Sequence, residues 1–425
     1  MIFKINIYTI TAALSALYMP STTLANQTDC VTSFNPKADY FPDKVQVKYN
    51  SGFSITYKGN SKHIRNNISD ETYILYQCGT PIPNDARPTP ANSSQVGGWT
   101  KVMAVPGTKV VLDSAPASAI IEFLDVQNSV AASYEHFAIT SPCMQKVIGA
   151  LPRVQQNFGT PKARRRNIID RVPRVFYDLA MEELQWTFTT YGMSDPHSIA
   201  VNPEDASDML GKAEWIKFVA AFYNKEARAN EIFDQIEARY NSVKRSAANG
   251  SKKTIGFARY SKVANGTVTG WTIDQPQQWM AQGLADAGLN VHSGGMTSFK
   301  SVDDFYEAVS GWDILIDLSS EPLPHGGATI PEWSNLVEGY KFSINNKVAK
   351  SLPFFASNSI YRSDLISSYQ NATDFSEHLQ VQPDDLLSDF VKLATGSLGA
   401  KDTKWLRNIP GKVPVHWVSP ADCKN

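Results

Sequence analysis

The stretch from Lys212 to Ala247, KAEWIKFVAAFYNKEARANEIFDQIEARYNSVKRSA, decides how this chain is organised. Large apolar residues recur along it at helical spacing: Trp215, Phe218, Val219, Phe222, Ile232, Phe233, Ile236, Tyr240 and Val243. A continuous helix of this length would reach roughly 50 Å, although Asn224 is placed to cap a second segment and to kink the helix there. The stretch therefore predicts one long linker helix, over residues 212–248, between two lobes.

Short apolar strands alternate with amphipathic helices on both sides of this helix. Before it, we expect strands at Lys109–Leu112, Val130–Ser133 and Arg174–Tyr177. After it, we expect strands at Thr254–Ala258, Val268–Ile273, Asp313–Leu318 and Pro353–Ala356, and a helix over Pro383–Ala394. This alternation predicts an α/β fold with parallel, helix-covered sheets. We expect two Rossmann-like lobes, the N-terminal one over residues 99–211 and the C-terminal one over residues 249–425.

Residues 26–98 are rich in strand patterns. Val45–Tyr49 and Phe53–Tyr57 alternate in polarity around the turn Asn50-Ser51-Gly52, which is typical of a hairpin. Thr72–Gln77 predicts another strand, and Thr80–Gly98, with its many Pro, Asn, Asp and Ser residues, predicts a loop. We expect an added antiparallel β region packed on the first lobe.

The N-terminus has the pattern of a secretory signal peptide over residues 1–25. Lys4 precedes an apolar stretch from Ile5 to about Met19, and Thr23-Leu24-Ala25 forms a small-x-Ala cleavage pattern. An uncleaved signal anchor is the alternative, but the apolar run is short for a membrane span and contains Asn6. We therefore expect a protein that follows the secretory pathway and is secreted or held at the cell surface.

Cysteines and glycosylation sequons agree with export. The four cysteines, Cys30, Cys78, Cys143 and Cys423, are far apart and lack CxxC spacing, so two disulfides fit better than a metal site, with the pairing left open. Asn-x-Ser/Thr sequons begin at Asn26 and at the glycosylation candidates Asn67, Asn92, Asn249, Asn265 and Asn371.

Charge and motifs exclude several functions. With 40 basic and 41 acidic residues, the chain lacks the basic excess of a nucleic-acid-binding protein. It has no GxSxG, HExxH, GxxxxGK[ST] or strand-linked GxGxxG motif, and we expect no enzymatic activity. Ser114 follows a strand, but without flanking glycines it fits a helix N-cap or a ligand hydrogen bond better than a nucleophile.

Two other kinds of site are weaker alternatives. His136 and His325 follow predicted strands, where they could face a cleft and hold a metal, although surface or capping roles are favoured. A secreted glycosidase would need paired carboxylates, for which the candidates are Asp113, Asp178, Glu182 and Asp317.

Aromatic residues give a more specific indication. Five fall at predicted strand ends or loops: Trp99, Tyr134, Tyr260, Trp271 and Trp279. Ligands of α/β sheets bind outside the carboxyl ends of the strands, and flat aromatic walls suit a large, partly apolar ligand. Each ring taken alone could equally belong to the core, to which we assign Trp215 and Trp312.

The chain resembles the helical-backbone class of periplasmic substrate-binding proteins, which carry cobalamin, ferric siderophores, haem and certain metals. The resemblance rests on residues 109–126, on Ala213–Phe233 and on Gln382–Phe390, and it covers roughly Trp99 to Thr395. With its sequons and its N-terminal strands the chain is similar to the eukaryotic branch, the algal cobalamin acquisition proteins.

The resemblance implies a monomer that captures cobalamin between its lobes for uptake, with no cofactor of its own and with a membrane transporter or receptor as partner. The implied ligand-binding residues are Ser114, Tyr134 and Glu135 on one lobe and Tyr260, Trp271, Trp279 and Ser319 on the other. A ferric siderophore, haem or a metal is the alternative ligand. An anionic chelate would favour an arginine cluster, and only Arg259 and Arg362 lie near predicted strand ends.

Overall fold

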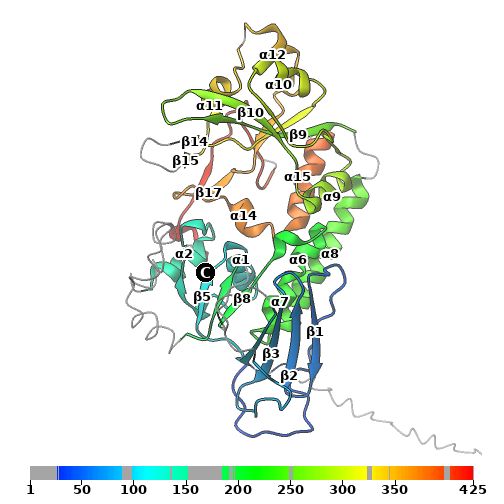
Figure 1. Cartoon of the computed structure of the whole chain (residues 1–425), viewed down its shortest axis with the longest axis vertical. Coiled ribbons are helices and arrows are strands. Elements are labelled where there is room, and N and C mark those ends of the chain that lie inside the picture. Colours follow the sequence, from blue (N-terminus) through cyan, green and yellow to red (C-terminus); the bar gives the residue numbers. More distant parts are fainter. Residues whose placement is uncertain are drawn as a thin grey trace, which may run out of the picture.

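The computed structural model describes residues 26, 28–88, 98–134, 136–151, 184–190, 195, 197–247, 252–322, 328–343, 345–396 and 403–424. They form a mixed α/β protein in which two lobes follow one another along the long axis (Figure 1). A separate N-terminal sheet packs beside the first lobe. The predicted strand Arg174–Tyr177 lies outside the described residues.

The N-terminal sheet has four strands: β1 (Phe53–Lys58), β2 (Ser61–Asn66), β3 (Glu71–Gln77) and β4 (Trp99–Val105). The first three are antiparallel, whereas β4 runs parallel to β3, so this sheet is mixed and continues past residue 98. Phe53 and Tyr73 pack their rings on Phe218, which joins the sheet to the first lobe.

The predicted hairpin between Val45–Tyr49 and Phe53–Tyr57 is wrong. Residues 45–49 form no strand, and β1 pairs instead with β2 across a turn at Gly59, whose φ of 55° suits glycine. The buried Glu214 carboxylate explains the difference, because it accepts the backbone N–H groups of Lys48, Tyr49 and Asn50 at 2.7, 2.8 and 2.9 Å. These amides therefore need no strand partner.

The first lobe is built on a parallel sheet in the order β6-β5-β7-β8. Its strands are β5 (Val110–Asp113), β6 (Val130–Ser133), β7 (Trp186–Thr189) and β8 (Ser198–Ala200), with the 3₁₀ turns η1 (Gln127–Ser129), η2 (His136–Ala138) and η4 (Pro203–Asp205). Its helices are α1 (Ala115–Phe123), α2 (Pro142–Gly149), α6 (Met209–Ala213) and α7 (Trp215–Ala221).

The linker helix is shorter than the sequence predicts. Of the stretch 212–247, α8 (Glu226–Ala247) is the part that crosses to the second lobe, and its 22 residues reach about 33 Å. Asn224 adopts a left-handed conformation with φ of 56° and separates α7 from α8. Residues 212–222 belong to the first lobe instead, where Trp215 and Phe222 are fully buried.

The second lobe contains a seven-stranded mixed sheet in the order β12-β10-β9-β13-β16-β18, with β11 beside β9. Its parallel centre consists of β9 (Thr254–Lys262), β13 (Ile314–Asp317) and β16 (Ile360–Arg362). The other strands are β10 (Val268–Asp274), β11 (Asn290–Val291), β12 (Thr297–Phe299) and β18 (Arg407–Asn408). Its helices are α9 (Gln278–Asp286), α10 (Val302–Ala308), α11 (Trp333–Gly339), α12 (Lys347–Ser351), α13 (Pro353–Ala356), α14 (Asp374–His378) and α15 (Pro383–Thr395).

The predicted strand Pro353–Ala356 is wrong, because these residues form α13. Proline is favoured in the first turn of a helix, because its fixed φ is helical and because an N–H at that position would have no partner within the helix. Leu352 is extended and serves as the N-cap. The third parallel strand begins later, at Ile360.

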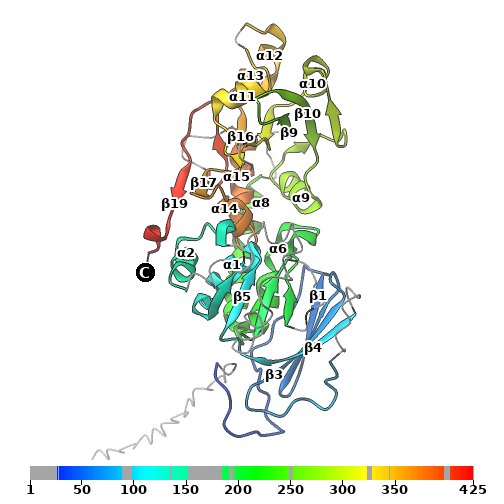
Figure 2. The same ribbon diagram turned by 60° about the vertical axis from the view of Figure 1, so that its left-hand side comes forward.

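Further contacts between described residues join the lobes. Helix α15 packs along α8, α9 packs on α6, and α14 packs on α1. The C-terminal tail leaves the second-lobe sheet at β18, pairs with β17 (Ile366–Ser368) through β19 (His416–Val418), and ends against α2 through η5 (Pro420–Asp422). Figure 2 shows β19 descending from the second lobe toward α2.

The two expected disulfides are present. Cys30–Cys78 closes the N-terminal region, and Cys143–Cys423 fastens the C-terminal tail to α2 of the first lobe. Within the described residues, no helix combines the length and the apolar character that a membrane crossing requires.

Candidate functional site

The carboxyl ends of the strands in both lobes converge on one segment, residues 363–381. This segment follows β16 and contains β17 and α14. Its Glu377 accepts a hydrogen bond from Ser118 of α1, the helix that follows β5. Its Asn371 donates to Ala328 of the hairpin that follows β13, formed by β14 (Glu321–Pro322) and β15 (Ala328–Thr329). Because α/β proteins hold ligands outside the carboxyl ends of their strands, this region is the candidate site.

On the second lobe these ends carry a network that we call the strand-end cluster: Tyr260, Lys262, Asp317, Ser319, Glu321, Tyr340, Arg362 and Asp364. The centre is the buried Asp317, whose Oδ1 accepts from the Ser319 and Tyr340 hydroxyls at 2.6 and 2.7 Å. Its Oδ2 pairs with Arg362, which also lies 2.5 Å from Asp364. Asp317 thus cannot serve as a free base.

Tyr260 and Ser319, two of the predicted ligand residues, meet in this cluster. The Ser319 hydroxyl accepts the Tyr260 N–H at 3.0 Å, and the Tyr260 hydroxyl donates to Glu321 at 2.5 Å. Burial first, and then this bond to Glu321, raises the pKa of Tyr260 above its ordinary value. The ring packs edge-on against Tyr340 and against Gly339, where an added Cβ would lie 2.4 Å from it.

The cluster has more carboxylates than cations. Asp364 also pairs with the buried Arg407, which reaches Glu332, and Lys262 lies between Glu321 and Glu338. Counting these neighbours, five carboxylates (Asp317, Glu321, Glu332, Glu338 and Asp364) face three cations (Lys262, Arg362 and Arg407). Each cation is held by at least two carboxylates, so the cluster is suited to a neutral or cationic ligand.

The first lobe presents hydroxyl groups at its strand ends. Ser114 is buried and caps α1 by accepting the Ala117 N–H, which is the N-cap role expected of it. Ser133 ends β6, and among the described residues its buried Oγ has no hydrogen-bond partner. Tyr134 follows it and is half-buried. Glu135 lies outside the described residues.

A buried polar contact, which we call the inter-lobe lock, joins α14 to the first lobe. Glu377 accepts from the Ser118 and Thr140 hydroxyls at 2.7 and 2.6 Å, from the Ser141 N–H at 3.1 Å and from the Thr140 N–H. These donors lie on α1 and at the N-terminus of α2, whose dipole favours a negative charge. A carboxylate of the second lobe therefore occupies an anion-binding position on the first.

The neighbouring His378 faces carboxylates that favour its charged form. Its Nδ1 lies 2.8 Å from Asp374, and its ring contacts Phe123. Burial alone would lower the pKa of His378, but the hydrogen bond to Asp374 and the charges of Glu377 and Glu122 raise it to about 9. Burial raises the pKa of Glu122. The lock therefore combines one cation with three carboxylates.

Trp271 and Trp279 are both buried; Trp271 lies directly opposite Tyr260 across the β9–β10 pair, whereas Trp279 lies at the contact between α9 and α6. Trp271 donates its indole N–H to Gly339 at 3.0 Å and stacks on Phe305, in the core of the second lobe. Trp279 covers the Lys212 ammonium at 4.3 Å, where α9 meets α6. In this conformation neither ring forms an exposed wall, and their role in ligand binding stays a prediction.

Sequence reasoning missed the apolar side chains that are exposed near the strand ends. Phe137 and Leu318 follow β6 and β13 and are 37% and 40% exposed. Tyr369 follows β17, is 73% exposed and stacks on Trp417 with ring centroids 5.7 Å apart. Phe137 and Leu318 lie beside the predicted strands Val130–Ser133 and Asp313–Leu318, which is a signal that could have found them, whereas no predicted strand lies beside Tyr369. The assignment of Trp215 and Trp312 to the core is confirmed, and Trp99 is buried too.

The alternative chemistries find little support in the described residues. Asp113 and Asp317 lie on different lobes, and Asp178 and Glu182 are outside the described residues. Among the described residues, no group of His, Cys, Asp or Glu side chains is arranged to hold a metal ion. The His136 side chain and His325 are not described. Arg259 pairs with Asp274 at the surface, away from Arg362.

Two hollows in the described part of the chain lie elsewhere. One, of about 610 Å³, lies between the N-terminal segment and the N-terminal sheet and is lined by Phe34, Pro36, Lys58, Asn60, Ile82 and Asp85 among others. The other, of about 660 Å³, is an aromatic groove on the second lobe that includes Trp333, Phe342 and Phe355. Neither involves the strand-end cluster.

Comparison with known proteins finds no matching family model. The chain is 22% identical, over 278 residues, to an uncharacterized lipoprotein of Methanocaldococcus jannaschii. That alignment covers 60% of this chain and 64% of the relative, which is less than two thirds of the relative's length.

Among solved structures, the chain is similar to a periplasmic binding protein from Veillonella parvula, with a TM-score of 0.45, 10% identity and coverage of 68% of this chain and 92% of that one. It is also similar to an ABC transporter substrate-binding protein from Listeria monocytogenes (TM-score 0.44, 12% identity, 68% and 99% covered). A third is a periplasmic heme binding protein from Pseudomonas aeruginosa (TM-score 0.43, 11% identity, 71% and 98% covered).

Proposed function

We propose that this chain is an exported solute-binding protein that holds a small molecule between its two lobes without chemically changing it. The observation that carries the proposal is the convergence of the strand carboxyl ends of both lobes on residues 363–381. Exposed Phe137, Leu318 and Tyr369 supply apolar contact area near these ends, and hydroxyls and carboxylates supply hydrogen-bond partners.

The charges of the strand-end cluster limit the chemical classes of ligand that the site would accept. The strand-end cluster and its neighbours hold five carboxylates and three cations, and each of these cations is already paired. An anionic catecholate chelate or the propionates of haem would meet a surplus of negative charge there. A neutral, amide-rich corrinoid would not, so cobalamin remains the first ligand to test. A cationic ferric hydroxamate chelate is favoured by the same charge count and is the second.

Uptake of such a ligand needs a membrane transporter or receptor, which we include in the proposal together with a monomeric, cell-surface or secreted protein. The proposal includes no catalytic step. Asp317 is fully engaged by Ser319, Tyr340 and Arg362, so it is not poised to move a proton.

The test is a calorimetric titration of the purified, secreted protein with cyanocobalamin, followed by visible absorbance of the protein peak after gel filtration. One-to-one binding with retained red colour is the expected result. Leu318→Asp and Tyr369→Ser should weaken binding at least tenfold, whereas Ile82→Ser, a matched exposed apolar position in the loop after β3, should not. If no heat and no co-eluting chromophore are found, cobalamin is excluded and ferric hydroxamates are titrated next.

The Tyr260→Phe substitution tests the contribution of the hydroxyl separately from that of the ring. It keeps the edge-on contact with Tyr340 but removes the 2.5 Å hydrogen bond to Glu321. Because Glu321 would keep its ion pair with Lys262, the fold should survive. A loss of affinity with an unchanged melting temperature would place the hydroxyl or Glu321 in contact with the ligand.

A further inference from the structure

Asn26 is fixed in place by hydrogen bonds of both its side chain and its main-chain nitrogen. It is 6% exposed. Its side-chain Nδ2 donates to the backbone oxygen of Asp43 at 3.0 Å and to Glu226 Oε2 at 2.7 Å, and its Oδ1 accepts the Asp43 N–H at 2.9 Å. Its own main-chain nitrogen donates to the Asp43 carboxylate at 3.1 Å.

The partners of Asn26 form a built site. Glu226 is the first residue of α8, is fully buried and pairs with the equally buried Lys62 at 2.5 Å. Lys62 in turn donates to the Ala221 carbonyl and to the Asn224 side chain, between α7 and α8. The site therefore connects the N-terminal segment to the start of the helix that joins the lobes.

The position of Asn26 in the sequence suggests why it is held by these contacts. The small-x-Ala pattern Thr23-Leu24-Ala25 ends immediately before Asn26. Hydrolysis of the Ala25–Asn26 peptide bond consumes one water, leaves a carboxylate on Ala25 and leaves an amine on Asn26 that is largely protonated at neutral pH. That ammonium would stand where the Asn26 amide now faces Asp43, and no cation pairs with Asp43 among the described residues.

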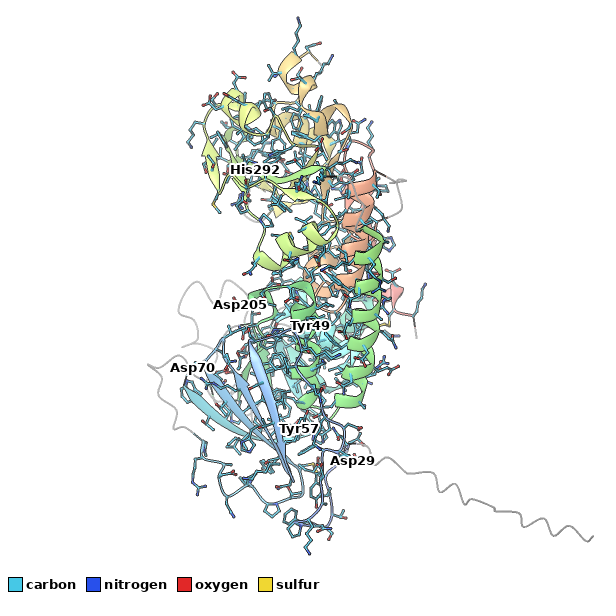
Figure 3. The ribbon with its side chains drawn as sticks, turned by 90° about the vertical axis from the view of Figure 1, so that its right-hand side faces the viewer. Asp29, Tyr49, Tyr57, Asp70, Asp205 and His292 are labelled. Atoms are coloured by element: carbon cyan, nitrogen blue, oxygen red, sulfur yellow. A yellow bond between two sulfur atoms is a disulfide. The ribbon has the colours of Figure 1, made fainter. Side chains whose placement is uncertain are left out.

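We propose that Asn26 is the N-terminal residue of the mature protein, and that its new α-ammonium binds the Asp43 carboxylate in this site. The hydrogen bond from a neutral amide to the carboxylate becomes an ion pair in which donor and acceptor are both charged. Figure 3 shows Asp29 and Tyr57 at the same end of the molecule, next to the start of α8, where this N-terminal segment is fastened. Four residues further on, Cys30 fixes the segment to Cys78.

The proposal also explains why the sequon at Asn26 differs from the others. A glycan is attached to Nδ2, the atom that binds both Asp43 and Glu226. A sugar there replaces one of the two N–H groups, so at least one of these bonds would be lost, and this asparagine serves the fold and not glycosylation. The inference rests on export of the chain, which is part of the proposed function, but not on the ligand.

The test begins with the full precursor expressed in a secretory host, where N-terminal sequencing and intact mass should show a chain that starts at Asn26. A second precursor carries a Gly-Ser insertion between Ala25 and Asn26, so that the ammonium is displaced from the site. Asp43→Asn should lower the melting temperature by several degrees in the first protein and much less in the second. Asp85→Asn, at an exposed ion pair with Lys58, should have little effect in either.

A chemical readout avoids dependence on the stability of the variants. Labelling of the α-amine at pH 7, followed by mass spectrometry, should be at least tenfold slower in the natural protein than in the extended one, because the paired ammonium is shielded. A different N-terminus, a retained leader, equal penalties for Asp43→Asn, or equal labelling rates would overturn the proposal. None of these outcomes depends on a ligand titration. A failure of the proposal about Asn26 can therefore be distinguished from a failure of the proposed function.

Discussion

Glu377 of α14 and Ser118 of α1 lie 2.7 Å apart across the junction of the lobes, although 259 residues separate them in the chain. The carboxylate is fully buried and bonded to donors from two first-lobe segments. It fixes how the two strand-end surfaces face each other, and it does so at the edge of the region where we place the ligand.

Replacing Glu377 should weaken this junction strongly. In Glu377→Ala, the amides and hydroxyls of residues 118, 140 and 141 lose their acceptor while they stay buried, and the positive His378 loses a neighbouring charge. We expect a loss of about 3 kcal/mol in the free energy of unfolding, measured by denaturant titration. Glu231→Ala, at an exposed ion pair with Arg228, is the control and should cost less than about 1 kcal/mol. Equal effects would contradict the role of the lock.

Stability should fall as pH rises from neutral to alkaline. The pKa of His378 is raised to about 9 in the folded protein, from 6.5 in the unfolded chain. The folded protein therefore binds the proton more tightly, and the stabilisation is complete below pH 6.5 and lost as pH rises through 9. Its size is on the order of 3 kcal/mol.

Denaturation midpoints measured from pH 6 to pH 9.5 test this dependence. His378→Gln should flatten the curve, whereas His416→Gln, at an exposed position in β19, should leave it as in the natural protein. A slope that persists in His378→Gln would assign the effect to another group.

Loss of the disulfide between Cys143 and Cys423 should destabilise the protein more than loss of the other disulfide. The first closes a separation of 280 residues and the second one of 48. Chain-entropy arguments assign them about 5.5 and about 4 kcal/mol. The comparison uses Cys143→Ser/Cys423→Ser and Cys30→Ser/Cys78→Ser, with hydrogen exchange as the second readout. Faster exchange confined to residues 403–424 in the first double variant would show that the tail has been released from α2.

Glycan mapping should distinguish Asn265 from Asn26. Asn265 lies exposed in the turn between β9 and β10, where its Oδ1 accepts the Thr267 N–H, and its Nδ2 is the atom to which a sugar would be attached. We expect glycosylated peptides at Asn265 and unmodified ones at Asn26. A glycan on Asn26 would contradict the hydrogen bonds that Nδ2 makes to Asp43 and Glu226.

Local patterns in the sequence were sufficient for most elements. The apolar spacing from Lys212 onward predicts helices, and Asn224 was a possible break. Its side chain also accepts a hydrogen bond from Lys62 of a distant strand, which the sequence does not indicate. The alternating polarity of Val45–Tyr49 likewise predicts a strand. In the structure, the carboxylate of Glu214, more than 160 residues away, accepts the backbone N–H groups of Lys48 and Tyr49 instead. Such long-range partners leave no local pattern.

The candidate site was harder to predict than the fold for the same reason. Tyr260 and Ser319 could be placed at strand ends from sequence, and they do meet. Trp271 could be placed at a strand, but its side of the strand is set by Phe305 and Gly339, which pack against it from elsewhere. The inter-lobe lock at Glu377 depends on the contact of α14 with the first lobe, and the spacing of apolar residues in the sequence does not predict that contact.

The bond between Cys143 and Cys423 has a topological consequence. Every peptide bond from α2 to the C-terminal tail, including all of α8, lies inside the closed ring that this disulfide completes. A single proteolytic nick anywhere in that ring opens it but does not divide the molecule, since both pieces stay on one covalent body. A protein exposed to extracellular proteases could thus be cut once in a surface loop and keep its lobes together.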